Sequence, residues 1–157
     1  MPIPPFVTDL RRMVGDHELW LPGVTAVVVH EGAVLLTLRA DNGQWAPVTG
    51  IIDPGEEPAL AARREALEET GVEISVDRLA SVGVIPPVTY ANGDRACYLD
   101  LTFACSWVAG TPYAADDENT DARWWPLDAL PPMDEHLRAR LEAALSGECA
   151  ARYRSGR

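Results

Sequence analysis

The chain has 157 residues, a formal net charge of −11 and an apolar fraction of 47%. This length suits one domain around a single hydrophobic core, and the apolar fraction excludes a disordered chain. The negative charge argues against nucleic-acid polymers and membranes as partners, because both are bound through clustered lysine and arginine. A small phosphorylated substrate is compatible with this charge if divalent cations bridge it to acidic residues.

The N-terminus and the cysteines predict a cytoplasmic protein. The segment Met1 to Arg12 carries prolines and an aspartate where a secretory signal has an apolar run, and no apolar run reaches the ~20 residues of a membrane span. The cysteines are odd in number and lack metal-ligand spacing, which is typical of a reducing compartment. Cys97 and Cys105 are expected to be core thiols on one strand, with Cys149 near the C-terminus.

The first part of the chain predicts a short helix followed by several strands. Val7–Val14 is expected to be helical, and Pro22-Gly23 ends that region. Glu31-Gly32 separates two β-branched apolar runs and therefore predicts a tight hairpin. The expected strands are Val24–His30, Ala33–Arg39, Trp45–Val48 and Gly50–Ile52.

Pro58–Thr70 predicts a helix, because Pro58 suits a first helical turn and Gly71 suits the position after the helix end. Its buried side is expected to contain Leu60, Ala66 and Leu67. The later elements are expected to be strands Leu79–Ile85, Cys97–Val108 and Ala122–Trp125, the helix Asp134–Leu145, and the loops Pro86–Arg95 and Ala114–Asp121.

Strands interleaved with helices predict an α/β or α+β domain in which a mixed sheet lies between helical layers. On the strand Cys97–Val108, the alternating residues from Cys97 to Trp107 are expected to form a core face. We expect residues 1–157 to form one domain, with an N-terminal extension over 1–22 and a tail over 146–157.

Three glutamates on the predicted helix indicate a metal site. Glu65, Glu68 and Glu69 stand at positions i, i+3 and i+4, so their carboxylates share one helix face and repel one another. Mg²⁺ relieves such repulsion, since it favours carboxylate, water and phosphate oxygens as ligands. Arg64 is expected to hold Glu68, or the turn at Glu56 and Glu57, in position.

The segment from Gly50 to Val72 resembles the Nudix box: a glycine, five residues, Glu56, seven residues, and then Arg64-Glu65-Ala66-Leu67-Glu68-Glu69-Thr70-Gly71-Val72. The resemblance extends over about Val24 to Leu145 and includes Arg123-Trp124-Trp125-Pro126-Leu127-Asp128-Ala129-Leu130. One departure is Pro47-Val48-Thr49-Gly50, where the family usually has Leu-Pro-Gly-Gly, and this difference alters the phosphate entrance.

The resemblance implies the Nudix fold and a Mg²⁺-dependent hydrolase, with Mn²⁺ as a possible substitute, that cleaves the pyrophosphate bond of a nucleoside diphosphate linked to another group. It implies metal ligation by Glu65, Glu68, Glu69 and the Gly50 carbonyl, and Glu118 is a further acidic candidate. Either Glu65 or Glu118 would accept the proton of the attacking water. A homodimer is possible, because many relatives are dimers.

The sequence does not determine the substrate, because two family markers indicate different substrates. Pro87 resembles a marker of ADP-ribose pyrophosphatases, whereas Tyr90 lies near a marker of dinucleoside polyphosphate hydrolases. The candidate substrate-binding residues are Arg39, Trp45, Tyr90 and Arg95.

Two other functions compete with hydrolysis. One is a ligand-binding regulatory domain without catalysis, although the acidic residues of the motif are all present. The other is isopentenyl diphosphate isomerase, which shares the fold and would use Cys97 or Cys105.

Overall fold

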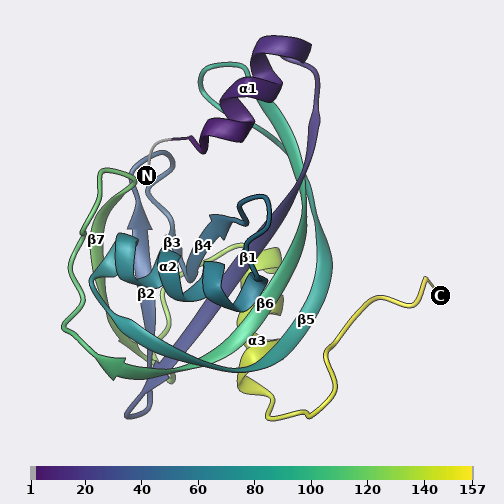
Figure 1. Cartoon of the computed structure of the whole chain (residues 1–157). Coiled ribbons are helices and arrows are strands. Elements are labelled where there is room, and N and C mark those ends of the chain that lie inside the picture. The colour runs from purple at the N-terminus through teal and green to yellow at the C-terminus, as the bar shows by residue number, and fades with distance from the viewer. Residues whose placement is uncertain (1–2, 157) are drawn as a thin grey trace.

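The computed structural model describes residues 3–156, which form a mixed seven-stranded sheet with three helices (Figure 1). The main strand order is β3-β2-β1-β6-β5, while β4 pairs with β1 and β7 pairs with β2. Only β1 and β6 run parallel among these pairs. In chain order the elements are α1 (Pro5–Val14), β1 (Leu19–His30), β2 (Ala33–Arg39), β3 (Trp45–Ala46), β4 (Val48–Ile51), α2 (Pro58–Thr70), β5 (Glu73–Thr89), β6 (Arg95–Ala109), β7 (Asn119–Pro126) and α3 (Glu135–Leu145).

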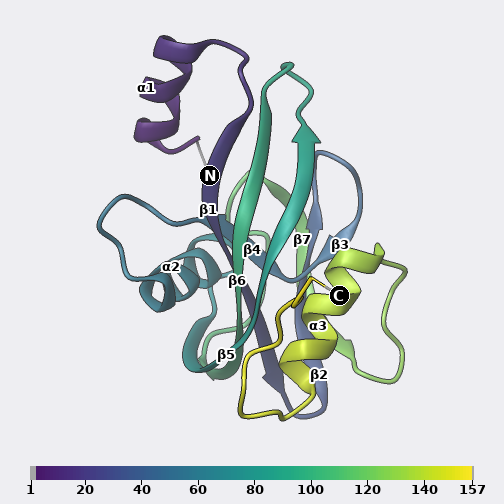
Figure 2. The ribbon, with the colours of Figure 1, turned by 90° about the vertical axis from the view of Figure 1, so that its right-hand side faces the viewer.

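Two helices cover opposite faces of the sheet, as the sequence predicted (Figure 2). α2 packs on one face, where Val24, Val28 and Phe103 belong to the core. α3 packs on the other face, where Val27 and Leu36 contribute. The central strand β1 is buried from both sides, which explains its nearly continuous run of apolar residues.

The predicted hairpin between β1 and β2 is confirmed. His30 pairs with Ala33, so Glu31 and Gly32 form a two-residue turn with φ angles of 47° and 76°. Positive φ at both central residues is the conformation that matches the right-handed twist of the flanking strands. Glycine adopts it without steric cost, whereas Glu31 is a rarer case.

The strands β1 and β5 extend further than the sequence indicated. β1 begins at Leu19 rather than Val24, so the expected extension over 1–22 includes part of the sheet. β5 continues to Thr89, and a register irregularity between Ile85 and Val88 accommodates Pro86-Pro87. The loop predicted over Pro86–Arg95 is therefore wrong in its length.

α1 explains why these long strands are stable. Its Val7 is buried together with Leu19, Leu21 and Ala96 in a small separate core. The helix itself matches the prediction for this region, and it begins two residues earlier, at Pro5. The upper end of the sheet is thus covered by α1 on one face (Figure 2).

The predicted core face of β6 is correct only at one end of the strand. Phe103 and Cys105 are buried on the α2 side, whereas Leu99 is exposed and Cys97 is only partly buried. The alternation of buried residues predicted for this strand therefore holds at Phe103 and Cys105 but not at Leu99. All three cysteines are free thiols.

α2 buries Ala66 as expected, but the prediction that Leu60 and Leu67 are buried is wrong. Leu60 and Leu67 are 53% and 50% exposed, while the buried side contains alanines and two of the glutamates. Small residues let the helix approach the sheet closely, and the two leucines lie beyond its contact stripe. The residues buried on α2 are Ala61, Ala62, Glu65, Ala66, Glu69 and Thr70.

The C-terminal residues return to the sheet. The Arg152 amide donates to the Ala80 carbonyl at 2.8 Å, and the Val82 amide donates to the Arg152 carbonyl at 3.0 Å. The tail therefore partly covers the edge of β5. Over residues 3–156, no helix is long and apolar enough to cross a membrane.

The packing of α2 predicts that Ala62→Leu destabilises the protein although it makes the helix more apolar. Ala62 is fully buried against the sheet, so the added carbons should lower the free energy of unfolding by about 1–3 kcal/mol. Urea unfolding measures this effect. Leu67→Ala is the matched control and should change stability by less than about 1 kcal/mol; the reverse order of the two effects would contradict the observed packing.

Candidate active site

Gly50 and Glu65 form the contact at which α2 meets the sheet. Gly50 lies on β4 and pairs with Val24 of the central strand. A Cβ atom at position 50 would overlap the carboxyl group of Glu65, so only glycine fits here. This close approach places the Gly50 backbone beside the helix face that carries the predicted metal ligands.

Arg64 organises the acidic residues around this contact. Its Nε and Nη2 atoms each donate to the Glu56 carboxylate at 2.8 Å, a bidentate ion pair. Its Nη1 donates to Glu65 at 2.8 Å and to Glu68 at 3.3 Å. Nη2 also donates to the Ile51 carbonyl at 3.2 Å, which ties α2 to the end of β4. The predicted positioning contacts with Glu56 and Glu68 are therefore present, and the contact with Glu65 is additional.

Glu65 is a buried carboxylate with one unused oxygen. The residue is fully buried, and its Oε1 accepts the hydrogen bond from Arg64. Its Oε2 is buried without any hydrogen-bond partner. Burial raises the pKa of Glu65 to about 7, although Arg64 opposes this shift. A buried carboxylate oxygen without a partner is costly in a folded protein, and a bound cation would offset that cost.

Glu69 is buried in a similar way, and Asn119 is its partner. The Asn119 Nδ2 atom donates to Glu69 Oε2 at 3.1 Å. Burial raises the pKa of Glu69 well above its ordinary value, and the nearby charges of Glu65 and Glu118 raise it further. Asn119 was not singled out from the sequence, since an isolated asparagine after an acidic loop resembles ordinary turn composition.

The loop before β7 brings Glu118 to the same place. The Ala115 amide donates to the Glu69 carbonyl at 3.0 Å, and the Ala40 amide donates to the Glu118 carbonyl at 2.8 Å. These backbone bonds fix the loop between the end of α2 and the end of β2. The charge of Glu118 raises the pKa of both Glu65 and Glu69, so the three carboxylates lie within electrostatic range of one another.

The donor set fits a divalent metal that takes part of its coordination from the substrate. Within residues 3–156, no three acidic, histidine or cysteine side chains already converge as a closed metal site. Mg²⁺ commonly binds through one or two carboxylates and completes its coordination with water and phosphate oxygens. The unused oxygen of Glu65 and the buried Glu69 supply ligands of that kind.

A cavity of about 600 Å³ opens beside these residues. Gly50 and Glu118 line it, and so do two of the predicted substrate-binding residues, Arg39 and Tyr90. The guanidinium of Arg39 is held by the Asp41 carboxylate through bonds of 3.0 and 2.7 Å. The Tyr90 hydroxyl lies 2.5 Å from the Tyr98 hydroxyl.

The other two predicted substrate-binding residues do not line this cavity. Trp45 packs edge-on against Trp125, with ring centroids 5.1 Å apart, and the Arg123 guanidinium lies over its ring. Arg95 forms an ion pair with Glu18 at 3.0 Å. In the structure these two residues make packing and surface contacts, and their contacts with substrate stay a prediction.

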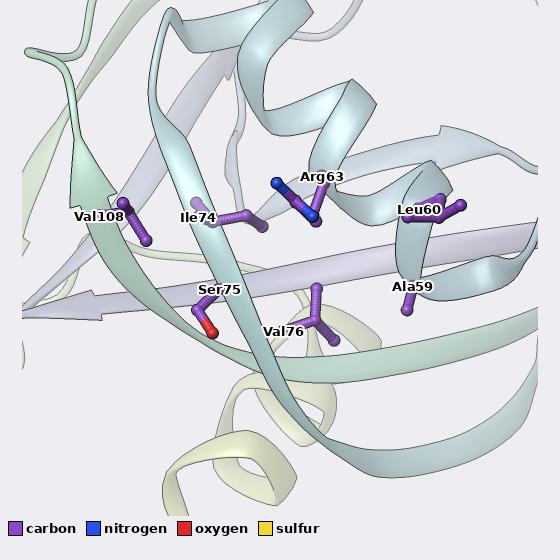
Figure 3. Close-up of a pocket in the computed structure, with 7 residues that line it drawn as sticks. All are labelled: Ala59, Leu60, Arg63, Ile74, Ser75, Val76 and Val108. Carbon is purple, nitrogen blue, oxygen red and sulfur yellow. The ribbon is translucent and has the colours of Figure 1, made fainter.

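A second, smaller pocket lies on the outer side of α2 (Figure 3). It has a volume of about 390 Å³, and α2, β5 and β6 each contribute to it. Arg63 is its one charged lining residue, and the lining contains none of the acidic residues described above. Of the acidic residues described above, Glu118 lines the larger cavity.

Sequence comparison places the chain among known proteins. The NUDIX domain model matches residues 20–145. A MutT-like protein of Streptomyces ambofaciens is 33% identical over 132 residues, which cover 83% of this chain and 79% of that protein. The nucleoside triphosphatase NudI of Salmonella schwarzengrund is 30% identical over 134 residues, which cover 79% of this chain and 94% of that protein.

Solved structures show the same fold. A NUDIX hydrolase from Nitrosomonas europaea superposes with a TM-score of 0.66 at 19% identity, and the match covers 84% of this chain and 76% of that one. At this identity the likeness concerns the fold alone.

The burial of Glu65 predicts a pH-dependent stability in metal-free buffer. Its pKa of about 7 lies above the ordinary value of 4.5, so the folded protein binds more protons than the unfolded chain between these values. The contribution of Glu65 to the free energy of unfolding should therefore fall as the pH rises from about 4.5 to about 7. Glu65→Gln should remove this part of the decline and be more stable than wild type at pH values above that range.

Urea unfolding with chelator present, repeated across this pH range, measures the effect. Glu73→Gln serves as the control, because Glu73 is exposed on β5 and carries no buried charge. If the free energy of unfolding depends on pH in the same way for wild type and Glu65→Gln, burial does not raise the pKa of the Glu65 carboxyl group.

Proposed function

The chain belongs to the Nudix hydrolase family, and from that premise we propose that it uses Mg²⁺ to hydrolyse the pyrophosphate bond of a nucleoside diphosphate linked to another group. Nucleoside triphosphates are the first substrates to test, because one relative is a nucleoside triphosphatase. ADP-ribose and dinucleoside polyphosphates remain in the same substrate class.

The proposal rests on one observation. Glu65 and Glu69 are buried, and neither carboxylate is fully paired with positively charged groups. Glu65 keeps an oxygen without a hydrogen bond, and burial raises the pKa of both carboxyl groups. The alanines of α2 pack against the sheet without help from the charges of Glu65 and Glu69, so these charges are not needed for the stability of the helix. Their retention is explained if the folded protein gains a cation at this place.

Bound Mg²⁺ would neutralise pyrophosphate charge and lower the pKa of the attacking water. We assign its ligation to Glu65 and Glu69, which are buried, with the more exposed Glu68 and the Gly50 carbonyl completing the set. Arg64 keeps Glu65 and Glu68 on the same side of α2 through its hydrogen bonds.

We assign the proton-accepting role to Glu118. It lines the cavity, and its backbone carbonyl is fixed by the Ala40 amide. Glu65 is the alternative, but it is fully buried behind Gly50 and already bonded to Arg64. Arg39 lies at the cavity wall and is available to a phosphate oxygen, since Asp41 takes only its Nε and Nη2 donors.

The isomerase alternative lacks an available cysteine. Cys105 belongs to the core on the α2 side, and burial raises the pKa of its thiol to about 12. The Cys97 thiol lies 3.7 Å from a Glu18 carboxylate oxygen. Neither residue lines the cavity. The regulatory alternative is less favoured, because a purely binding domain can lose these carboxylates and this chain keeps all of them.

The metal site predicts that chelation abolishes hydrolysis and that Glu69→Gln lowers turnover by about 10²-fold or more, because the substitution preserves size and removes the charge that holds metal. Phosphate release from nucleoside triphosphates measures turnover with and without Mg²⁺. The melting temperature of wild type should rise with Mg²⁺, and that of Glu69→Gln should rise less.

Glu73→Gln is the matched control for this experiment and should keep wild-type turnover. Full activity in excess chelator would overturn the metal mechanism. If Glu69→Gln and Glu68→Gln both keep wild-type turnover, the assignment of metal ligands on α2 is wrong.

The cysteines predict a contrasting result. Cys97→Ser and Cys105→Ser should keep hydrolysis within about twofold where the variant is folded, because neither thiol reaches the cavity. Circular dichroism establishes folding before turnover is measured. A large loss of turnover in a folded cysteine variant would instead favour the isomerase reaction.

A further inference from the structure

A buried polar cluster lies at the α3 side of the large cavity and contains none of the residues assigned above to metal binding. Asp100 on β6 and Thr25 on β1 are both buried in the sheet. Arg140 on α3 reaches them from the helix layer, and the cavity is lined by Asp100 and Arg140 as well as by Gly50 and Glu118. A single cavity therefore connects Gly50 and Glu118 with a second charged group.

Asp100 is almost fully satisfied by this cluster. The hydroxyls of Thr25 and Thr102 each donate to its carboxylate at 2.7 Å. Arg140 Nη1 lies 3.5 Å from Asp100 and donates to the Thr25 hydroxyl oxygen at 2.8 Å. Buried charges are expected to be paired in this way, so the Asp100 carboxylate is explained by its neighbours.

Arg140 is not satisfied to the same degree. Its Nε donates to the His136 carbonyl at 3.3 Å, and Nη1 is used by Thr25 and Asp100. Its Nη2 has no hydrogen-bond partner among residues 3–156, and it is not one of the fully buried atoms without a partner. The side chain is only 13% exposed, so this free edge of the guanidinium is held in a fixed direction and remains accessible.

The charges around Arg140 determine what this edge would bind. Asp100 neutralises the guanidinium, and the acidic Asp134 lines the same cavity. A phosphate would meet no net positive charge there. A neutral hydrogen-bond acceptor, by contrast, gains a fixed charge-assisted donor without the cost of removing a charged group from water.

We propose that Arg140 selects the base of the substrate by donating from Nη2 to an oxo group on the base edge. This inference rests on the proposed hydrolysis of a nucleotide, because the phosphates would occupy the acidic end of the cavity and the base its α3 end. Arginine donors recognise oxo groups on bases in this manner, whereas an amino group at the same position would present a second donor and be rejected. The predicted preference is for oxo-substituted over amino-substituted bases.

Two matched substrate pairs test the proposal. Inosine and adenosine triphosphates differ by an oxo or amino group on the purine, and uridine and cytidine triphosphates differ likewise on the pyrimidine. Wild type should prefer the oxo member by about 10-fold or more in kcat/KM, mainly through KM. Arg140→Lys should bring the ratio to within about threefold, because lysine still neutralises Asp100 but has no second planar edge.

A second variant separates recognition from folding. Asp100→Asn combined with Arg140→Met removes both charges together, so neither is left buried alone, and it should lose the same preference. Arg138→Lys is the matched control, since Arg138 is exposed on the same helix and does not line the cavity. It should keep the wild-type ratio. Melting temperatures show which variants are folded.

Binding without turnover keeps this test independent of the proposed reaction. Calorimetry with inosine and adenosine monophosphates should show the oxo preference in wild type and its loss in Arg140→Lys, even if none of the four triphosphates is hydrolysed. Absence of hydrolysis would then count against the proposed function alone. Equal binding of both nucleotides by wild type, or an unchanged preference in Arg140→Lys, would overturn the role of Arg140.

Discussion

The burial of two glutamates between α2 and the sheet is the constraint on which the rest of this structure depends. Glu65 and Glu69 point into a protein interior that raises the pKa of both carboxyl groups. Arg64 donates a hydrogen bond to Glu65 and Asn119 donates one to Glu69, but Glu65 keeps an oxygen without a hydrogen bond. Burying such a group costs stability, and the proposed cation would offset that cost.

This constraint explains the composition of the surrounding elements. Carboxylates reach the sheet only if the helix approaches closely, so the packed side of α2 has alanines beside the two glutamates, while its leucines are exposed. The same approach excludes any side chain at Gly50. The loop before β7 is then fixed to the end of α2 by the Ala115 amide, which brings Glu118 to the cavity.

The cavity has two chemically different ends, supplied by different layers of the fold. Gly50 and Glu118 form an acidic end suited to metal and phosphate, and Arg140 with Asp100 forms a neutral, directional end on the α3 side. Residues far apart in the chain meet here because β1 and β6 pair in parallel along the centre of the sheet. A substrate that spans both ends would be positioned by its phosphates and selected by its base.

The sequence alone determined the hairpin at Glu31-Gly32, the limits of α2 and the acidic set on that helix, because turn residues, helix ends and helical spacing are local properties of the chain. It predicted the burial of Ala66 but not that Leu60 and Leu67 are exposed while Glu65 and Glu69 are buried, since hydrophobicity favoured the leucines and the close contact between α2 and Gly50 favoured the glutamates. The partners Asn119 and Arg140 were equally hidden, as were the surface and packing positions of Arg95 and Trp45. These depend on the direction of each side chain after the sheet has assembled, and that direction follows from strand register and helix docking and not from local sequence.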